Sequence, residues 1–529
     1  SKDEKNHTSY HFYDLNAKLN YRFSDRSRMY FNWYSGDDAL RVRQEWYHSA
    51  ASGTYSENGS GWKWGNMLAS LNWNYVFSPQ LFANMSAIYS RFRSDINIYD
   101  MSVDKAGGVE TTRSRTNMTH NSGIRDIGYR MDLDWSPHPN HAVRFGSNYL
   151  FHSFRPEESG ASSSTGTGEA EVADADKFQG RTLPAHEVSF YAEDDMDVTP
   201  ALKVNAGLHF SLFHVEKKTY AGLQPRLSAR YLLGRDWSVK ASYALMNQYV
   251  HLLSGSTVSL PNDLWVPVTR NIRPMISNQF STGVYHELNR TWNFSLEGYY
   301  KTMNNLIEYR DGASMFSTST DWQDRVAMGR GTAYGIEWLA QKPEGRLNGW
   351  LGYGLSWADR QFPNGEINGG RRFWAKYDSR HKINLAAVYK LSDKVDVNGT
   401  WTYYTGGWMT VGLESYDRSP ILPGSNVAQQ PVSPSDWSIK HYESRNNYRM
   451  SDYHRLDLGL NIRRPKKNGH TGTWNISAYN VYARRNPTFA YPDIENTFDG
   501  EGNRTGSRPV IQETSILSVI PSISYTYTF

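Results

Sequence analysis

The sequence predicts an all-β protein, a transmembrane antiparallel β-barrel with about 19 strands in this chain. Three observations lead to this fold class: apolar and polar residues alternate along many segments, the segments are long, and short and long connections alternate between them. Strict alternation is the period of a strand with one apolar and one polar face. A strand that crosses a bilayer needs about 9–11 residues, and alternating connection lengths are typical of outer-membrane barrels.

The alternation is clear from the first segment, 15–23, where Leu15, Ala17, Leu19, Tyr21 and Phe23 alternate with polar residues. The same pattern recurs at 66–77, 126–135, 202–210 and 522–529. The polar faces carry Asp, Arg, Lys and Asn, which suit a wet lumen, so the apolar faces are expected to meet lipid. Residues expected to face lipid are Leu15, Leu71, Leu133, Val204, Leu296 and Leu458, and residues expected to face the lumen are Asn16, Asn72, Asp132, Lys203, Glu297 and Asp457.

Composition excludes several other classes of protein. The chain of 529 residues is 14% aromatic, which argues against disorder. It has no apolar run of 18 residues for a transmembrane helix, and no cysteine for disulfides or thiolate ligands. The net charge of +4 is too balanced to indicate nucleic acid. A large soluble β protein is the alternative, but its strands are usually only about five or six residues long.

The connections fall into two sets that alternate along the chain. Nine short ones, rich in turn-forming residues, are expected at the periplasmic rim: 24–27, 78–80, 136–140, 199–200, 234–236, 289–291, 343–346, 392–394 and 465–469. Nine longer ones are expected at the extracellular rim: 36–61, 100–114, 156–183, 216–222, 247–273, 308–324, 360–371, 406–446 and 486–508. Eighteen connections join nineteen strands.

An odd number of strands does not close an antiparallel barrel, and single-chain bacterial barrels have even numbers. Three more strands would give 22, the size of the plugged transporters. We therefore expect residues 1–529 to be one transmembrane barrel domain whose first strands, about three, and N-terminal plug lie outside this chain.

Several short phrases occur in the order known from one family. They lie at 141–149, 190–194, 199–202, 205–208, 225–227, 241–243, 298–307, 335–337, 453–457, 480–482 and 486–487. With these phrases the chain resembles the barrel domain of TonB-dependent outer-membrane receptors over nearly its whole length. The terminal Phe529 resembles the signal read by the barrel-assembly machinery.

The resemblance implies a receptor in the cell outer membrane of a diderm bacterium, surrounded by outer-membrane lipid. Such a receptor binds a scarce solute at its extracellular loops and imports it through a plugged barrel, on which TonB acts through the plug. The solute would be of the siderophore, cobalamin, oligosaccharide or peptide class, and a surface lipoprotein is a further conceivable partner. No haem-receptor phrase is present. The alternatives are a passive porin and a scaffold that binds partner lipoproteins.

Two groups of residues are candidates for binding. Loop aromatics can bind ligand or pack the loops together: Trp46, Tyr47, Trp62, Trp64, Trp265, Trp322, Trp374, Trp408 and Trp437, with Tyr416 and Tyr442. Charged residues of the polar face are expected to hold the plug or to face an anionic ligand: Arg130, Arg144, Lys203, Arg226, Arg230, Lys240 and Glu297.

Catalysis is not predicted. Asp378 and His381 could form an acid–base pair, but in the resembling family a similar pair begins a strand. The 16 histidines are scattered and show no His-x-x-x-His pair on a predicted helix, and no nucleophile motif is present. We therefore expect no catalytic residue, no metal site and no cofactor.

Overall fold

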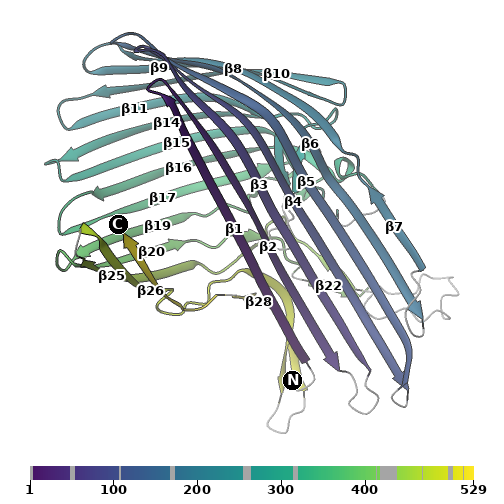
Figure 1. The fold of residues 1–529 in the computed structure, drawn as a ribbon. Helices are drawn as coiled ribbons and strands as arrows, with labels where there is room; N and C mark the ends of the chain where they lie inside the picture. The colour runs from purple at the N-terminus through teal and green to yellow at the C-terminus, as the bar shows by residue number, and fades with distance from the viewer. Residues whose placement is uncertain are drawn as a thin grey trace.

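The computed structural model describes residues 4–47, 54–106, 109–166, 173–253, 264–313, 320–412, 414–417, 438–466, 469–498, 504–515 and 517–529. Nearly all regular structure in them is β-strand (Figure 1). The two helices of these ranges are single 3₁₀ turns, η1 (Trp322–Arg325) and η2 (Asn368–Gly370). Within the same ranges, no helix has the length and apolar character needed to cross a membrane.

One large antiparallel sheet contains 21 strands. Its first half consists of β1 (Glu4–Ser24), β2 (Ser27–Tyr47), β3 (Tyr55–Ser78), β4 (Leu81–Ala106), β5 (Val109–His138), β6 (His141–Gly166), β8 (Leu183–Asp197), β9 (Leu202–Val215), β10 (Lys218–Leu232) and β11 (Trp237–Gln248). Its second half consists of β14 (Met275–Leu288), β15 (Trp292–Tyr309), β16 (Val326–Lys342), β17 (Leu347–Gln361), β19 (His381–Lys390), β20 (Val395–Tyr404), β25 (Tyr453–Pro465), β26 (Thr471–Tyr479) and β29 (Ile520–Thr528).

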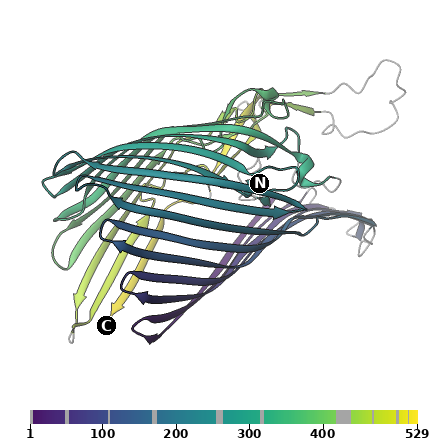
Figure 2. The same ribbon diagram turned by 90° about the horizontal axis from the view of Figure 1, so that it is seen from above.

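Each of these strands pairs with the next one along the chain, and the sheet curls round into the wall of a barrel (Figures 1 and 2). Two shorter strands complete the 21: β7 (Ala173–Gln179) pairs with β6, and β18 (Phe373–Trp374) pairs with β17. Without these two, nineteen strands cross the sheet from rim to rim, which is the number that the connections predict.

The pairing register shows which side chains share a face. Leu71 lies opposite Phe31 and Ala87, and the same face continues through every later strand. Following the register puts all six residues predicted to face lipid on one face and all six predicted lumenal residues on the other. The apolar face is widely exposed; Leu296, for example, is 51% exposed. Exposing so large an apolar surface to water would be unfavourable, whereas contact with lipid is favourable.

Eight of the nine predicted short connections are tight turns at one rim of the sheet, and the ninth, 465–469, lies between β25 and β26 and includes residues outside the described ranges. Four predicted long connections are wrong. The span 216–222 is a two-residue turn, Glu216–Lys217, with both φ angles positive, a geometry that matches the twist of an antiparallel hairpin. The spans 36–61 and 100–114 are mostly strand, because β2 to β5 continue to Tyr47, Tyr55, Ala106 and Val109. The span 156–183 is also mostly strand, because β6 continues to Gly166 and pairs there with β7.

The misassigned spans belong to unusually long strands. β1 to β6 contain 21, 21, 24, 26, 30 and 26 residues, well beyond the length a bilayer requires. In Figure 1 they extend past the rest of the sheet at the rim of the long connections. Beyond the membrane both faces are wet, so the strands need no apolar alternation there. The sequence pattern therefore ends before the strands do.

The edges of the sheet are β1 and β29. Among the described residues no pairing joins these two strands, and all nine residues of β29 are exposed. An unpaired edge leaves backbone N–H and C=O groups without partners, which costs several kcal/mol per group in hydrocarbon.

Small hairpins stand at the rim of the long connections. They are β12 (Val250–Leu253) with β13 (Leu264–Pro267), β21 (Trp408–Met409) with β24 (Tyr448–Arg449), β22 (Glu414–Asp417) with β23 (Ser438–His441), and β27 (Phe489–Phe498) with β28 (Arg504–Thr514). The first hairpin contacts β5 and β6 through β13 and the distant β15 through β12. It therefore lies across the interior, and its Leu253, Leu264 and Val266 are fully buried.

Candidate functional site

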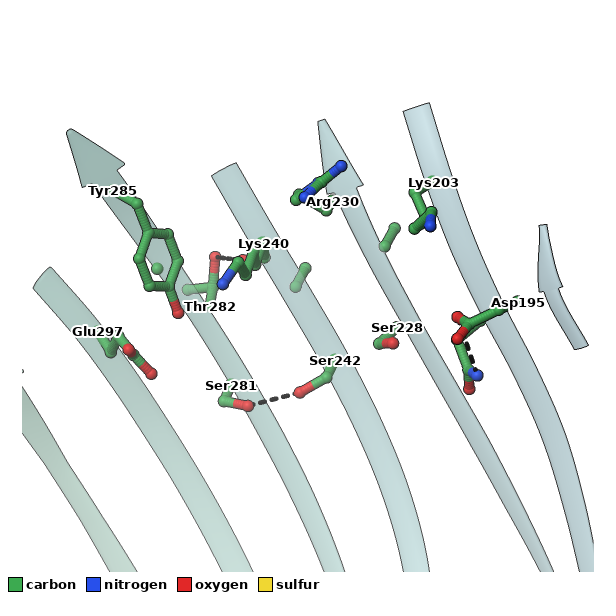
Figure 3. Close-up of a pocket in the computed structure, with 14 residues that line it drawn as sticks. Asp195, Lys203, Ser228, Arg230, Lys240, Ser242, Ser281, Thr282, Tyr285 and Glu297 are labelled. Carbon is green, nitrogen blue, oxygen red and sulfur yellow. Dashed lines mark hydrogen bonds between the residues drawn. The ribbon is translucent and has the colours of Figure 1, made fainter. Parts of the chain in front are cut away.

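The inner face of the sheet carries a polar cavity of about 280 Å³ between β8 and β15 (Figure 3). Three cationic side chains line it, Lys203, Arg230 and Lys240, with the carboxylates of Asp195 and Glu297. The Lys240 ammonium lies 3.8 Å from the centre of the Tyr285 ring, a cation–π contact. Cations outnumber carboxylates here, so the cavity suits an acidic or strongly polar surface.

A second cavity, of about 650 Å³, lies on the same face between β3 and β10 and is lined by Arg130, Arg144 and Arg226. Arg144 bridges Asp134 at 2.9 Å and Glu193 at 3.0 Å, and Arg130 pairs with Asp132 at 2.7 Å. By contrast, Arg226, Arg230 and Lys240 form no ion pair with any other residue that the structure describes. They leave positive charge available on the inner face.

All seven charged residues predicted for the polar face share one face of the sheet. The register links them through the pairs Arg144–Glu193, Arg230–Lys203 and Arg230–Lys240, and through Lys240–Gly283 and Gly283–Glu297. The fold brings Lys203, Arg230, Lys240 and Glu297 together in the first cavity. Arg130, Arg144 and Arg226 meet in the second.

Above these cavities, a buried ion pair joins opposite parts of the wall. Glu157 of β6 accepts from Arg325 of η1, the turn that leads into β16. Glu157 is 1% exposed, and burial raises the pKa of its carboxyl, although Arg325 opposes this effect. Nearby, Ser159 donates to Glu157 and bonds the His120 ring at 3.0 Å. Burial, with Arg325 adding to it, lowers the pKa of His120 to about 4.

The hairpin β12–β13 holds a second buried histidine. His251 donates from Nε2 to the backbone carbonyl of Arg273 at 3.2 Å, and burial lowers its pKa to about 4. Together with η1, this hairpin forms what we term the cover, residues 250–253, 264–272 and 322–325. The cover closes part of the interior at the rim of the long connections.

The aromatic residues predicted to lie in loops differ in their burial and in the elements to which they belong. Trp322 is buried at 3% exposure in the apolar cluster of the cover, so it stabilises the loops and offers no ligand surface. Trp265 of β13 is 39% exposed, as is Tyr47. Trp46, Tyr47, Trp62 and Trp64 lie in β2 and β3, not in a loop, which corrects the prediction.

Two further tryptophans support local structure. Trp374 lies 4.7 Å from the Arg380 guanidinium, and Trp408 donates to Asp378 at 3.2 Å. Tyr416 belongs to β22 and Tyr442 is 46% exposed. Trp437 lies outside the described residues.

Asp378 and His381 do not bond each other. Asp378 accepts from the backbone N–H of Ala358 at 2.8 Å, while the His381 ring bonds the Tyr353 hydroxyl at 2.9 Å. Each therefore has a structural partner where β19 begins.

The comparison with known proteins decides the family. The sequence model described as "TonB dependent receptor-like, beta-barrel" matches residues 6–505. The chain belongs to this family of TonB-dependent receptors. A search of curated proteins by sequence finds no match. The family is one of receptors and transporters in the bacterial outer membrane, and that is where this receptor barrel resides.

Solved structures agree with the fold of this receptor barrel. The ferric-catecholate import receptor Fiu from E. coli K12 aligns with a TM-score of 0.53 and 12% identity, covering 99% of this chain and 81% of Fiu. FpvA of P. aeruginosa aligns with a TM-score of 0.54 and 12% identity, and the alignment covers 99% of this chain and 71% of FpvA. The ferric citrate transporter FecA aligns with a TM-score of 0.52 and 10% identity, and the alignment covers 99% of this chain and 78% of FecA.

Sequence reasoning missed a cluster of aromatics on the inner face of the receptor barrel. Tyr10 and Phe12 of β1 share this face with Trp62 and Trp64 of β3. The Tyr10 ring stacks on Trp64 at 6.4 Å, and the rings of Trp62 and Trp64 are 4.4 Å apart. We term these four residues the inner aromatic cluster. Counting back in steps of two from Asn16, which is assigned to the lumen, puts Asp14, Phe12 and Tyr10 on the same face, and that signal could have placed both aromatics on the inner face.

Proposed function

We propose that this receptor barrel imports a scarce solute from outside the cell, with TonB acting through a plug inside the barrel. The observation that carries the proposal is the set of unpaired cations Arg226, Arg230 and Lys240 on the inner face. A packed apolar core would not hold them, whereas a hydrated plug with acidic side chains would. We propose that Arg130, Arg144, Lys203 and Glu297 also contact the plug.

The two sheet edges support a larger barrel. β1 and β29 are unpaired with each other, and each presents a row of backbone donors and acceptors. We propose that about three further strands fill this gap and close a barrel of 22 strands, with a plug attached to them. Pairing along both edges would remove the cost of leaving backbone groups unsatisfied in lipid.

The solute is proposed to bind on the inner aromatic cluster and on Trp265 of the cover. Tyr10 and Phe12 are 54% and 63% exposed, so their rings are free to contact a ligand. Among the structurally similar proteins, Fiu is an import receptor for ferric catecholates, FpvA binds ferripyoverdine and FecA transports ferric citrate. A ferric siderophore is therefore the solute class that we propose, ahead of cobalamin, oligosaccharides and peptides.

Uptake by whole cells tests this proposal. The intact protein is expressed in the outer membrane of cells with and without TonB, and accumulation of ⁵⁵Fe-labelled siderophores of several chemical types is measured. Import that requires both the receptor and TonB is the expected result. Equal uptake without TonB, together with steady ion conductance of the pure protein in planar bilayers, would instead indicate a passive channel.

A further inference from the structure

A small basic cavity lies on the lipid-facing side of the barrel, away from the solute path. It has a volume of about 410 Å³ and is formed by β15, β16, β17 and the segment before β18. We term it the outer cavity; its polar lining residues are Thr302, Asn304, Arg330, Thr332, Asp359, Gln361 and Arg372.

The register shows that the outer cavity opens toward the membrane. Thr302 lies opposite Thr332, and Thr332 lies opposite Asp359, on the same face as Leu296. Two residues along each strand toward the rim of the short turns, Tyr300, Tyr334 and Trp357 form a stacked row on the same face, with ring centres 6.3 and 5.2 Å apart. Such an aromatic row marks the boundary between hydrocarbon and headgroups in outer-membrane barrels. The outer cavity lies about 7 Å beyond this row, at the level of the headgroups.

The chemistry of the outer cavity is that of an anion site with sugar-binding groups around it. Arg330 bonds only the neutral amide oxygen of Gln361, at 3.0 and 3.2 Å, so its charge is not compensated there. Arg372 pairs with Asp359 at 3.1 Å. Two guanidinium groups thus face one carboxylate, beside two threonine hydroxyls and the Asn304 amide. Guanidinium groups bind phosphate strongly because their donors fit its oxygens in pairs.

The wall of the outer cavity is held in place by stacking. The Arg380 guanidinium lies 4.9 Å from the Trp357 ring and 4.7 Å from the Trp374 ring. The Asp378 carboxylate fixes this same guanidinium at 3.3 Å. A ligand would therefore meet a preorganised site, which reduces the entropy lost on binding.

We propose that the outer cavity binds the phosphorylated sugar headgroup of an outer-leaflet glycolipid, with Arg330 and Arg372 on the phosphate. A lipid is the favoured source of the phosphate because the cavity opens on the lipid side directly above the aromatic row. The threonines and amides contact the sugar. The site is separate from the inner face on which solute binding is proposed.

The test uses the intact receptor in lipid nanodiscs and measures binding of lipid A by native mass spectrometry. Lipid A with its phosphates, dephosphorylated lipid A and inorganic phosphate are compared as probes. The variant Arg330→Gln should weaken binding of phosphorylated lipid A about tenfold, the effect of losing one charge-assisted contact. Arg330→Lys should recover part of the binding. Arg235→Gln removes the same charge at the opposite rim, in the turn after β10, and should bind as the unchanged protein does.

Three outcomes would overturn the proposal. One is equal binding of phosphorylated and dephosphorylated lipid A. Another is equal binding by Arg330→Gln and Arg235→Gln. The third is displacement of the lipid by inorganic phosphate at the same concentration, which would indicate a simple anion site. Because Arg330 is exposed and bonds only Gln361, its replacement leaves no buried charge unpaired, and the fold should persist.

Discussion

Glu157 and Arg325 pair across the interior although 168 residues separate them in the sequence. One belongs to the wall at β6 and the other to the turn before β16, so the pair fastens the cover to the opposite side of the barrel. Both side chains are almost fully buried, at 1% and 7% exposure.

We expect Glu157→Gln to loosen the cover, because Arg325 would keep a buried charge without its carboxylate. Breaking such a pair costs about 3–5 kcal/mol. Hydrogen exchange of residues 264–272 and 322–325 should rise sharply, while exchange in β14 to β17 stays the same. The double variant Glu157→Gln/Arg325→Met removes both charges and should restore much of the protection. If the single variant exchanges like the unchanged protein, the pair does not fasten the cover.

Acid should loosen the same region. His120 and His251 have folded-state pKa values of about 4, below the ordinary 6.5, so both are neutral in the folded protein. Their contribution to stability is present above pH 6.5 and is lost as pH falls from 6.5 toward 4. At pH 5 the loss is about 2 kcal/mol per histidine. Hydrogen exchange of the cover between pH 7.5 and 5, corrected for intrinsic rates, measures it. His120→Gln/His251→Gln should remove most of this dependence, and an unchanged profile would contradict the assignment.

Arginine on the lipid face should be costly. Leu133→Arg puts a charge into hydrocarbon and should destabilise the barrel by about 2–4 kcal/mol if the site is near the midplane. Reversible unfolding of the intact protein in lipid vesicles measures the change. Ser295→Arg, on the inner face of β15, is the matched control and should have little effect. Equal costs for the two variants would refute the assignment of faces.

Reversing one inner charge should loosen the proposed plug. Lys240→Glu turns a free cation of the first cavity into an anion, which repels acidic groups on the plug. We expect a larger ion leak through the intact receptor in planar bilayers. Arg235→Glu makes the same charge change in a turn outside that cavity and should leave the leak unchanged. Equal leaks in both variants would exclude Lys240 from the plug contact.

The transmembrane wall could be predicted from the sequence because lipid imposes a strict rule on each strand. Alternation at Leu71 to Phe77 or Leu202 to Phe210 fixes both the strand and its faces. The extensions of β2 to β5 could not be predicted, because residues such as Asp37 and Arg93 lie beyond the membrane, where polar groups are tolerated on both faces. Asp37 and Arg93 instead pair across β2 and β4 at 2.8 Å.

The candidate site was only partly predictable, because part of it depends on contacts that leave no pattern along a single strand. The inner charges follow from alternation, so Lys203 and Glu297 could be assigned to a face. The burial of Trp322 and the pair Glu157–Arg325 depend on contacts between segments far apart in the chain. Local pattern carries no information about such contacts.

The unequal lengths of the strands give the receptor a slanted outer rim. β5 has 30 residues and β19 has 10, about 100 and 34 Å when extended. The tall side, formed by β1 to β6, stands above the membrane surface as a rigid paired sheet. A large macromolecule that approaches this receptor from outside would therefore meet the tall side first.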